Sequence, residues 1–325
     1  MNWIGKANYN LNLKYSLKNT MKNSSNKLTI CHWNANGLYA RINDGSIYKL
    51  LTYLGKHPSL VLCITETKIS EKSKNRNEVE IYFKIQGYNI IFNPASPHGG
   101  TAVISKEKIS LIRLGFGKMF SDNDESRLLI VECMGVKVMV VYAPSVKTPT
   151  KISTSEERYK FKTGDWHREI MRVIEEESAM SEMVICGDFN VARDENDLWF
   201  VPVLKKDKVN YRAYDYFDSR DRKNFEEILE KGYIDIYREM NPDKKGGFTA
   251  FDSRIPGAAS MDWKGGRRLD YILPRRGVQF EDFVIDKRIR GSDHFPIYCT
   301  IDFSNETEVE DDIDIESARV RKNQI

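Results

Sequence analysis

Cysteine is scarce in this sequence, and it forms no paired motif. The five cysteines are odd in number, show no CxxC spacing, and each lies in an apolar, β-like run. A disulfide framework or a zinc site is therefore not expected. We expect buried free thiols in a protein from a reducing compartment.

Long apolar runs and a strong charge of one sign are also missing. No apolar run approaches the roughly 18 residues that a membrane-spanning helix needs, so no membrane partner is expected. Lysine and arginine total 50 against 47 acidic residues, so net charge does not argue for a nucleic-acid partner. Hydrophobic residues make up 41% of the 325 residues, which is enough for one large α/β domain or two small ones.

The two ends of the chain differ in composition from the middle. Residues 1–26 contain lysine and asparagine but no acidic residue and no arginine. Because organelle-targeting peptides are rich in arginine, we favour a disordered arm and keep a targeting segment as the alternative. Residues 305–325 form an acidic segment that we expect to be a solvated, disordered tail. The predicted domain spans residues 27–304.

Short runs of β-forming residues recur between these ends, with a few amphipathic helical patterns among them. The predicted strands are 28–33, 60–64, 101–105, 128–132, 136–142, 183–186, 271–273 and 297–302. The predicted helices are 46–56, 165–177 and 222–231. Many strands with few helices between them favour two packed sheets flanked by helices over a doubly wound parallel sheet. No repeat or Gly/Ser linker divides this region, so we expect a single α/β domain.

Polar side chains follow the ends of several strands. The strand at 183–186 runs into Gly187-Asp188-Phe189-Asn190. Residues i and i+2 of a strand share a face, so we expect Asp188 and Asn190 to point at one site beyond the sheet edge. Other acid, amide, phenol and imidazole groups also end or follow strands: Asn34, Asn36, Glu66, Tyr142, Asp270, Asp293 and His294. Any one of them could be a surface or capping group, but so many in one chain indicate a shared site.

The strand ends carry motifs that resemble a known family. CHWNANGL, ITETK, YAP, GDFNVA, RLDYIL and GSDH occur in the order and spacing of the endonuclease/exonuclease/phosphatase superfamily. NVARDENDL, the segment 217–242 and FTAFDSR further resemble exonuclease III-type apurinic/apyrimidinic (AP) endonucleases. The resemblance covers nearly all of the chain except its two ends. It implies a four-layer α/β sandwich of the deoxyribonuclease I type, with two packed mixed β-sheets flanked by helices.

The resemblance implies metal-dependent hydrolysis of a phosphodiester. That reaction needs neutralised phosphate oxygens, a deprotonated water and a stabilised leaving oxygen. Mg²⁺ takes hard oxygen ligands and few carboxylates, so we expect Mg²⁺, or Mn²⁺ in its place, on Glu66 with Asn36 beside it. Asp293 is a further candidate ligand.

The other residues are assigned to the phosphate and the attacking water. Asp188 is expected to be the general base, and Asn190 to orient the water or a phosphate oxygen. His294 would donate to the phosphate in its protonated form, and the resemblance places Asp270 behind its other nitrogen. Tyr142 would contact the phosphate or assist the leaving oxygen. Three more residues are expected to bind phosphate or to hold a neighbouring ligand: Asn34, Lys68 and Ser145.

Two positions of the substrate pocket depart from the AP endonuclease pattern. Relatives of this type have a small aromatic pocket that accepts the flipped-out, base-free sugar. One aromatic wall falls on Ala250, and the other wall, Trp or Leu in relatives, falls on Arg267. We therefore expect a wider and more polar pocket. Ser145 stands where the family has Asn or Gln. The segments HGGTAVISK and WNANGL are typical of retrotransposon endonucleases.

Other polar residues receive structural or less specific interpretations. His32 is interpreted as a satisfied core or edge histidine, and Arg127 and the Asp235–Arg238 pair as structural ion pairs. Residues 200–216 and 245–268 are irregular insertions, which are often functional. Basic residues cluster there and before GSDH, where they either contact the DNA backbone or are solvated: Lys205, Lys206, Lys208, Arg212, Lys264, Arg267, Arg268, Lys287, Arg288 and Arg290.

Together with the patterns, the resemblance implies a monomeric enzyme that acts on double-stranded DNA. The expected activity is cleavage 5′ to abasic sites in base excision repair, with 3′–5′ exonuclease or 3′-phosphodiesterase activity as an accompaniment. The expected compartment is the nucleus, with a mitochondrion or another organelle as the alternative. The competing hypotheses are a retrotransposon-like DNA-nicking endonuclease, a phosphatase of small phosphate esters and a non-catalytic DNA-binding relative.

Overall fold

The computed structural model describes residues 26–57, 59–94, 99–145, 155–179, 181–199, 216–251 and 265–304. The predicted arm, except Asn26, and the predicted tail lie outside these ranges, so their disorder and the domain boundaries stay predictions. Most residues of the two insertions, 200–216 and 245–268, also lie outside the described ranges. None of the helices in the described ranges has the length and apolar character that a membrane crossing requires.

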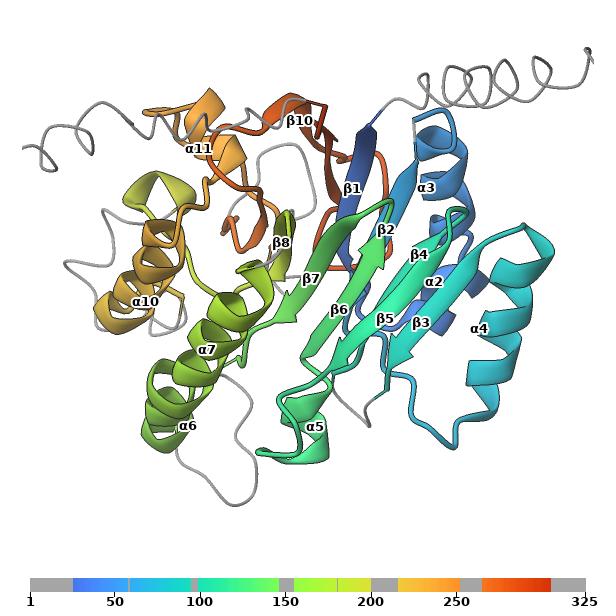
Figure 1. Cartoon of the computed structure of the whole chain (residues 1–325), viewed down its shortest axis with the longest axis horizontal. Coiled ribbons are helices and arrows are strands. Elements are labelled where there is room, and N and C mark those ends of the chain that lie inside the picture. The colour runs from blue at the N-terminus through green and yellow to red at the C-terminus, as the bar shows by residue number, and fades with distance from the viewer. Residues whose placement is uncertain are drawn as a thin grey trace, which may run out of the picture.

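Two mixed β-sheets pack against each other and carry helices on their outer faces (Figure 1). The six-stranded sheet has the order β10-β11-β1-β2-β4-β3, and the five-stranded sheet has the order β5-β6-β7-β8-β9. Adjacent strands are parallel in the pairs β1–β2 and β7–β8 and antiparallel elsewhere. The first sheet contains β1 (Lys27–Asn34), β2 (Leu60–Thr65), β3 (Asn89–Asn93), β4 (Thr101–Ser105), β10 (Gln279–Ile285) and β11 (Ile297–Asp302). The second contains β5 (Ile109–Leu114), β6 (Leu128–Cys133), β7 (Val136–Tyr142), β8 (Met183–Asp188) and β9 (Asp270–Leu273).

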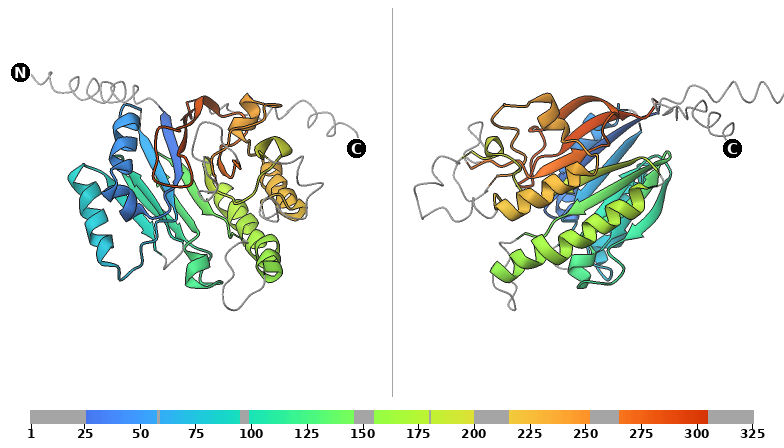
Figure 2. Two further views of the ribbon diagram at one scale, coloured as in Figure 1. Left: turned by 180° about the vertical axis from the view of Figure 1, so that it is seen from behind. Right: turned by 60° about the vertical axis from the view of Figure 1, so that its left-hand side comes forward.

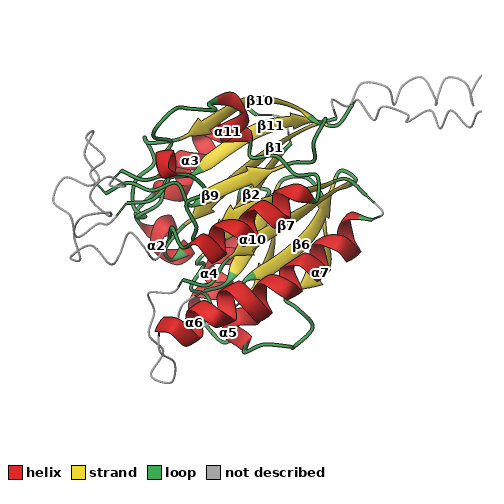
Figure 3. Ribbon diagram, turned by 90° about the vertical axis from the view of Figure 1, so that its left-hand side faces the viewer, coloured by secondary structure: helices red, strands yellow, loops and turns green. Residues whose placement is uncertain are grey.

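Helices on both outer faces complete four layers, as the resemblance implies (Figures 2 and 3). The first sheet is covered by α2 (Leu38–Asn43), α3 (Ser46–Leu54) and α4 (Lys74–Ile85). The second is covered by α6 (Ser155–Phe161), a π-helical turn (Lys162–Trp166), α7 (His167–Ser178) and α10 (Ser219–Glu230). Short helical pieces lie in the connections: α5 (Asp122–Glu125), a 3₁₀ turn (Glu195–Asp197) and α11 (Ile236–Met240).

Side-chain alternation along the strands explains how these layers are held together. On β1, Cys31 and Trp33 pack under the helices of the first sheet, whereas Leu28 and Ile30 pack against the second sheet. Each central strand is apolar on both faces because one face meets helices and the other meets the opposite sheet. All five cysteines are buried and free, as expected.

The predicted strands are all present, with ends that differ by at most two residues, and the three predicted helices are present as α3, α7 and α10. The sequence prediction missed β3, β5 and β10. All three are edge strands. It also missed α2, α4, α5, α6 and α11.

Candidate active site

The second sheet ends in two adjacent carboxylates. On β8, Val184 and Cys186 pack between the sheets, and Asp188 is the next residue on that face. Asp270 begins β9 directly opposite Asp188, because these two strands are antiparallel. Both carboxylates are almost fully buried, with 1% and 0% of the residue exposed.

The first sheet brings polar side chains to the same place. Asn34 ends β1, and its Nδ2 donates to Asp188 Oδ2 at 2.9 Å and to Glu66 Oε1 at 3.0 Å. Glu66 directly follows β2 and also accepts from the hydroxyl of Tyr142, the last residue of β7, at 2.8 Å. These hydrogen bonds join the ends of four strands from both sheets into one network.

His294 lies just before β11 and completes this network. Its Nδ1 donates to Asp270 Oδ2 at 2.8 Å, and its Nε2 is 3.9 Å from Asp188 Oδ2. Thr249 Oγ1 donates to the same Asp270 oxygen at 2.5 Å. The imidazole therefore sits between two carboxylates and is itself buried.

Burial and charge set the protonation of these groups. Burial lowers the pKa of His294, but the carboxylates of Asp270 and Asp188 outweigh it and raise the pKa from 6.5 to about 10. Burial raises the pKa of Asp188 to about 7, against the lowering effect of His294. Burial also acts to raise the pKa of Asp270, yet the charge and hydrogen bond of His294 lower it overall. At neutral pH His294 is thus a cation beside a carboxyl group that can take up or release a proton.

A second polar group at this edge is suited to a hard cation. Lys68 Nζ is 3.3 Å from Glu66 Oε2 and donates to Asn36 Oδ1, while Asn36 Nδ2 donates to Asp293 Oδ1 at 2.9 Å. Burial acts to raise the pKa of Glu66, but hydrogen bonds from Asn34 and Tyr142 and the charge of Lys68 lower it, so the carboxylate is ionised. Oxygen atoms of the kind that Mg²⁺ binds therefore surround the Lys68 ammonium.

Three residues of this second polar group have an uncommon backbone conformation. Asn36, Glu66 and Lys68 have φ angles of 49°, 51° and 53°, in the left-handed region that such residues rarely adopt. Strained conformations of this kind persist where the surrounding structure holds them and are frequent at functional sites. Here they lie in the turns that directly follow β1 and β2.

The buried triad of Asp188, Asp270 and His294 is a second set of potential cation ligands. One ligand atom from each lies within 4.8 Å of the other two. In this arrangement the His294 imidazolium lies between the two carboxylates. The assignment of the metal to Glu66, Asn36 and Asp293, whose candidate donor atoms are all oxygens, stays a prediction.

Asn190 does not share a strand face with Asp188, contrary to the prediction. Strand β8 ends at Asp188, and Asn190 has a φ of 49° in a turn whose backbone N–H donates to Asp188 Oδ1 at 2.9 Å. Its side-chain Nδ2 donates to the carbonyl oxygen of Ala143 at 2.9 Å. Asn190 thus fixes the Asp188 carboxylate through its backbone and ties the turn to the end of β7.

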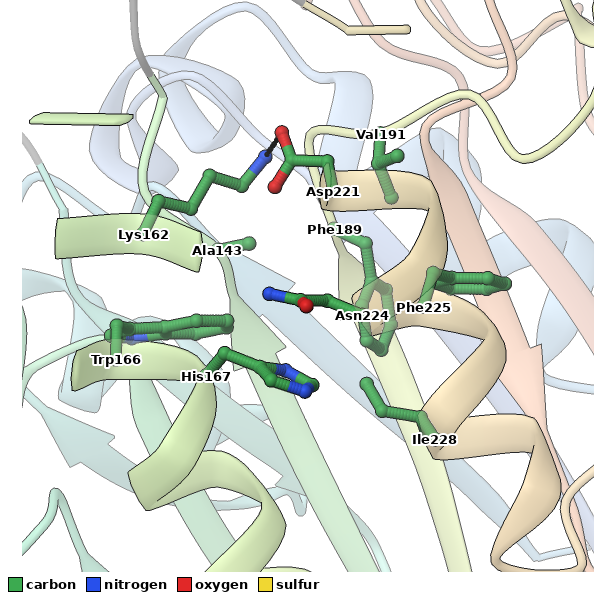
Figure 4. A pocket seen from close by; sticks show the side chains of 10 residues that line it. All are labelled: Ala143, Lys162, Trp166, His167, Phe189, Val191, Asp221, Asn224, Phe225 and Ile228. Carbon is green, nitrogen blue, oxygen red and sulfur yellow. Dashed lines mark hydrogen bonds and ion pairs between the residues drawn. The ribbon is translucent and has the colours of Figure 1, made fainter. Parts of the chain in front are cut away.

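A buried ion pair supports this turn from behind. Lys162 Nζ donates to Asn190 O at 2.9 Å and to Asp221 Oδ2 at 2.8 Å (Figure 4). Both side chains line a cavity of about 20 Å³ under Phe189, which is roughly the space for one water molecule. The cavity is too small for a substrate and belongs to the support of the site.

The two positions that depart from the AP endonuclease pattern lie side by side next to His294. Ala250 and Arg267 exchange backbone hydrogen bonds of 2.8 and 2.9 Å, and Ala250 also bridges to His294. Ala250 is buried, whereas Arg267 is half-buried with its guanidinium 4.6 Å above the Tyr216 ring. Ser145 is half-buried just beyond β7, and its role at the phosphate stays a prediction.

Some assignments of charged residues were wrong. Arg268 is fully buried and pairs with Asp197 and Asp235 at 2.8 and 2.7 Å, so it does not face DNA. The expected Asp235–Arg238 ion pair is not formed, because Asp235 pairs with Arg268 while Arg238 pairs with Asp197.

Other charged residues agree with their assignments or are not described. Arg127 pairs with Asp124 at 3.0 Å, as expected, and stacks on the ring of Tyr142 at 4.5 Å. The basic residues at 205–212 and Lys264 lie outside the described residues.

Comparison with known proteins identifies the family. A model of the endonuclease/exonuclease/phosphatase family matches residues 31–294. An exodeoxyribonuclease of Bacillus subtilis is 30% identical over 278 residues, which cover 84% of this chain and 99% of that protein. A DNA-(apurinic or apyrimidinic site) endonuclease of Dictyostelium discoideum is 29% identical over 287 residues, 87% of this chain and 73% of that protein.

A solved structure supports the same relationship. The AP endonuclease of Archaeoglobus fulgidus superposes with a TM-score of 0.69 at 25% identity, covering 84% of this chain and 98% of that one. The family match spans the first strand-end motif through His294, which are the residues that build the network described above. The chain therefore belongs to the endonuclease/exonuclease/phosphatase family.

Proposed function

We propose that this protein is an Mg²⁺-dependent AP endonuclease, which cuts double-stranded DNA 5′ to an abasic site and leaves a 3′-hydroxyl. The observation that carries the proposal is the buried His294 imidazole, held between Asp270 and Asp188 at the meeting point of both sheets. The names of the relatives supply the substrate class. A 3′–5′ exonuclease or 3′-phosphodiesterase activity and a role in base excision repair belong to the same proposal.

Each residue of the network has its own role in the proposed hydrolysis. Protonated His294 donates from Nε2 to a phosphate oxygen, and Asp188 removes the proton from the attacking water. Asp270 keeps the imidazole oriented and charged. Tyr142, whose pKa burial and the Glu66 carboxylate raise well above 10, stays a hydroxyl donor toward the phosphate or the leaving oxygen.

Glu66 would hold the metal ion together with Asn36 and Asp293. When bound, Mg²⁺ neutralises charge on the phosphate and on the leaving oxygen, and Mn²⁺ can replace it. Lys68 is then free to leave Glu66 and contact a phosphate oxygen. Asn34 holds Glu66 and Asp188 at a fixed separation.

A substrate panel tests the proposal. Purified protein with Mg²⁺ is incubated with an abasic-site duplex, an intact duplex of the same sequence, a 3′-phosphate duplex and a soluble inositol phosphate. We expect the abasic duplex to be cut fastest, and Asp188→Asn to lose about 10²- to 10⁴-fold in rate while it still binds DNA. An abasic duplex left whole while another substrate is consumed would overturn the assignment.

The second candidate is a retrotransposon-like nicking endonuclease. It is favoured by one observation, the replacement of the aromatic pocket walls by Ala250 and Arg267 beside His294. Preferential nicking of the intact duplex in the same panel would select it.

The remaining proposals concern the state of the protein in the cell. We propose a monomer located in the nucleus, with an organelle as the alternative. Imaging of a fluorescent fusion with and without residues 1–26 tests the location. The alternative is selected if only the full chain enters an organelle.

A further inference from the structure

A second histidine lies behind the active site. His32 is on β1, on the face that carries Ile30 toward the opposite sheet, two residues before Asn34. Its Nδ1 is 3.4 Å from Asp270 Oδ1, and both side chains have no exposed surface. The contact crosses from the first sheet to the second, directly below the site.

The two facing atoms are both buried and both lack a hydrogen bond. Neither His32 Nδ1 nor Asp270 Oδ1 has a hydrogen-bond partner, and at 3.4 Å each is the polar atom that faces the other. The other oxygen of Asp270 is already occupied by His294 Nδ1 and Thr249 Oγ1. A buried carboxylate oxygen without a donor is costly, so an approach of a few tenths of an ångström by the imidazole would satisfy both atoms.

The surroundings of His32 fix which ring nitrogen carries the proton. Burial lowers the pKa of His32 to about 4, against the raising effect of Asp270, so the ring is neutral at pH 7 and has one N–H. Nε2 is 3.2 Å from the Thr65 hydroxyl, which can donate to it. The single proton therefore belongs on Nδ1, where it points at Asp270. The opposite tautomer would place a lone pair against a carboxylate oxygen.

We propose that His32 is a positioning residue of the active site, which holds Asp270 from behind so that the carboxylate keeps His294 aimed at the substrate phosphate. The proposal rests on the proposed function for the role of His294. It revises the interpretation of His32 as an ordinary core histidine. His32 itself does not reach the substrate, because Asp270 and His294 lie between them.

A double-mutant cycle on cleavage tests the proposal. His32→Leu removes the donor, and kcat should fall on the order of 10- to 100-fold with KM little changed, because the imidazole loses its alignment. His32→Asn, whose amide can donate from about the same place as Nδ1, should recover most of the rate. In an Asp270→Asn background, His32→Leu should cost little more, since both changes break one chain of contacts.

The controls separate positioning from stability. Ile30→Val, on the same strand and face, should leave kcat unchanged while it alters the buried core. Thermal midpoints of all variants show whether each is folded at the assay temperature. His32→Leu with wild-type kcat, or with the same loss in both backgrounds, would overturn the proposal.

A spectroscopic measurement decides the question without any substrate. In protein labelled with ¹⁵N-histidine, the His32 ring is identified as the signal that His32→Leu removes. We expect its Nδ1–H tautomer at pH 7. An Nε2–H tautomer or a charged ring would refute the inference even if the enzyme cuts DNA. A wild-type protein that cuts no DNA but has the Nδ1–H ring would instead refute the function alone.

Discussion

At the scale of single residues, the chemistry of each group is set by neighbours from several elements. Three residues keep Glu66 ionised: Asn34 on β1, Lys68 just after β2, and Tyr142 on β7. Tyr142 in turn has Arg127 stacked on its ring. The hydroxyl of Tyr142 is therefore a fixed donor to a carboxylate that we assign to the metal.

Removing that donor should weaken cleavage. Tyr142→Phe deletes a hydrogen bond to a charged group, which is worth about 1.5–3 kcal/mol, so kcat/KM should fall roughly 10- to 100-fold. Tyr39→Phe is the matched control, because Tyr39 donates to the exposed Glu78 at 2.7 Å and this hydrogen bond is not part of the network. Equal rates for Tyr142→Phe and the control would contradict the role of Tyr142.

The residue types of the site were predictable, whereas several of their contacts were not. Asp188, Glu66 and His294 lie at or near strand ends in recognisable motifs, so their convergence could be expected from the sequence. The left-handed turn at Asn190 and the contact of His32 with Asp270 depend on how two sheets meet. No local pattern in the sequence reports that packing.

At the scale of elements, the π-helical turn Lys162–Trp166 has a clear structural purpose. It interrupts the helical segment α6–α7 where Lys162 reaches inward to Asn190 and Asp221. Such turns are rare and are frequent at functional sites. The turn places a buried ammonium where it holds the backbone beside Asp188.

Breaking this ion pair should destabilise the protein. Lys162→Met leaves Asp221 buried without its cation and should cost about 3–5 kcal/mol in the free energy of unfolding. Lys162→Met/Asp221→Asn should recover part of that loss, because no uncompensated charge remains. Urea unfolding measures the free energy of unfolding of both variants, and unchanged m-values show that the midpoints report stability.

A surface pair on α10 provides the control for this experiment. Lys223 pairs with Glu227 at 3.7 Å and is largely exposed, so Lys223→Met should cost at most about 1 kcal/mol. If Lys162→Met lowered the free energy of unfolding by no more than Lys223→Met does, the buried pair would not support the turn.

The strands that sequence patterns missed share one physical property. β3, β5 and β10 lie at sheet edges, and most of their residues are exposed or half-buried. These three strands face solvent along much of their length, so they lack the continuous apolar run of central strands such as β8. The strands that position the site were predictable because they are buried, including β9, an edge strand whose four residues are all buried.

At the scale of the whole molecule, a buried charge network ties the connections around the site to the second sheet. Arg268, next to β9, pairs with Asp197 of the 3₁₀ turn and with Asp235 at the start of α11. Burial acts to raise the pKa of Asp235, but Arg268 lowers it below 3.8 overall. The pair therefore stabilises the fold fully above that pH.

The acid dependence of stability follows from this shift. As pH falls below about 3.8, the unfolded chain takes up a proton at Asp235 before the folded protein does, so the stabilisation is lost. The difference in unfolding free energy between wild type and Asp235→Asn should be constant from pH 7 to about 4 and then narrow. A constant difference down to pH 3 would exclude a lowered pKa at Asp235.

The central claim is that the ends of both sheets build one site for a cation and a phosphodiester. It is tested most directly by Mg²⁺ titrations of abasic-duplex cleavage for wild type, Glu66→Gln and Asp188→Asn. We predict that Glu66→Gln raises the Mg²⁺ concentration at half-maximal rate, whereas Asp188→Asn lowers the maximal rate and leaves that concentration nearly unchanged. Wild-type Mg²⁺ dependence in Glu66→Gln, or an undiminished maximal rate in Asp188→Asn, would contradict the account.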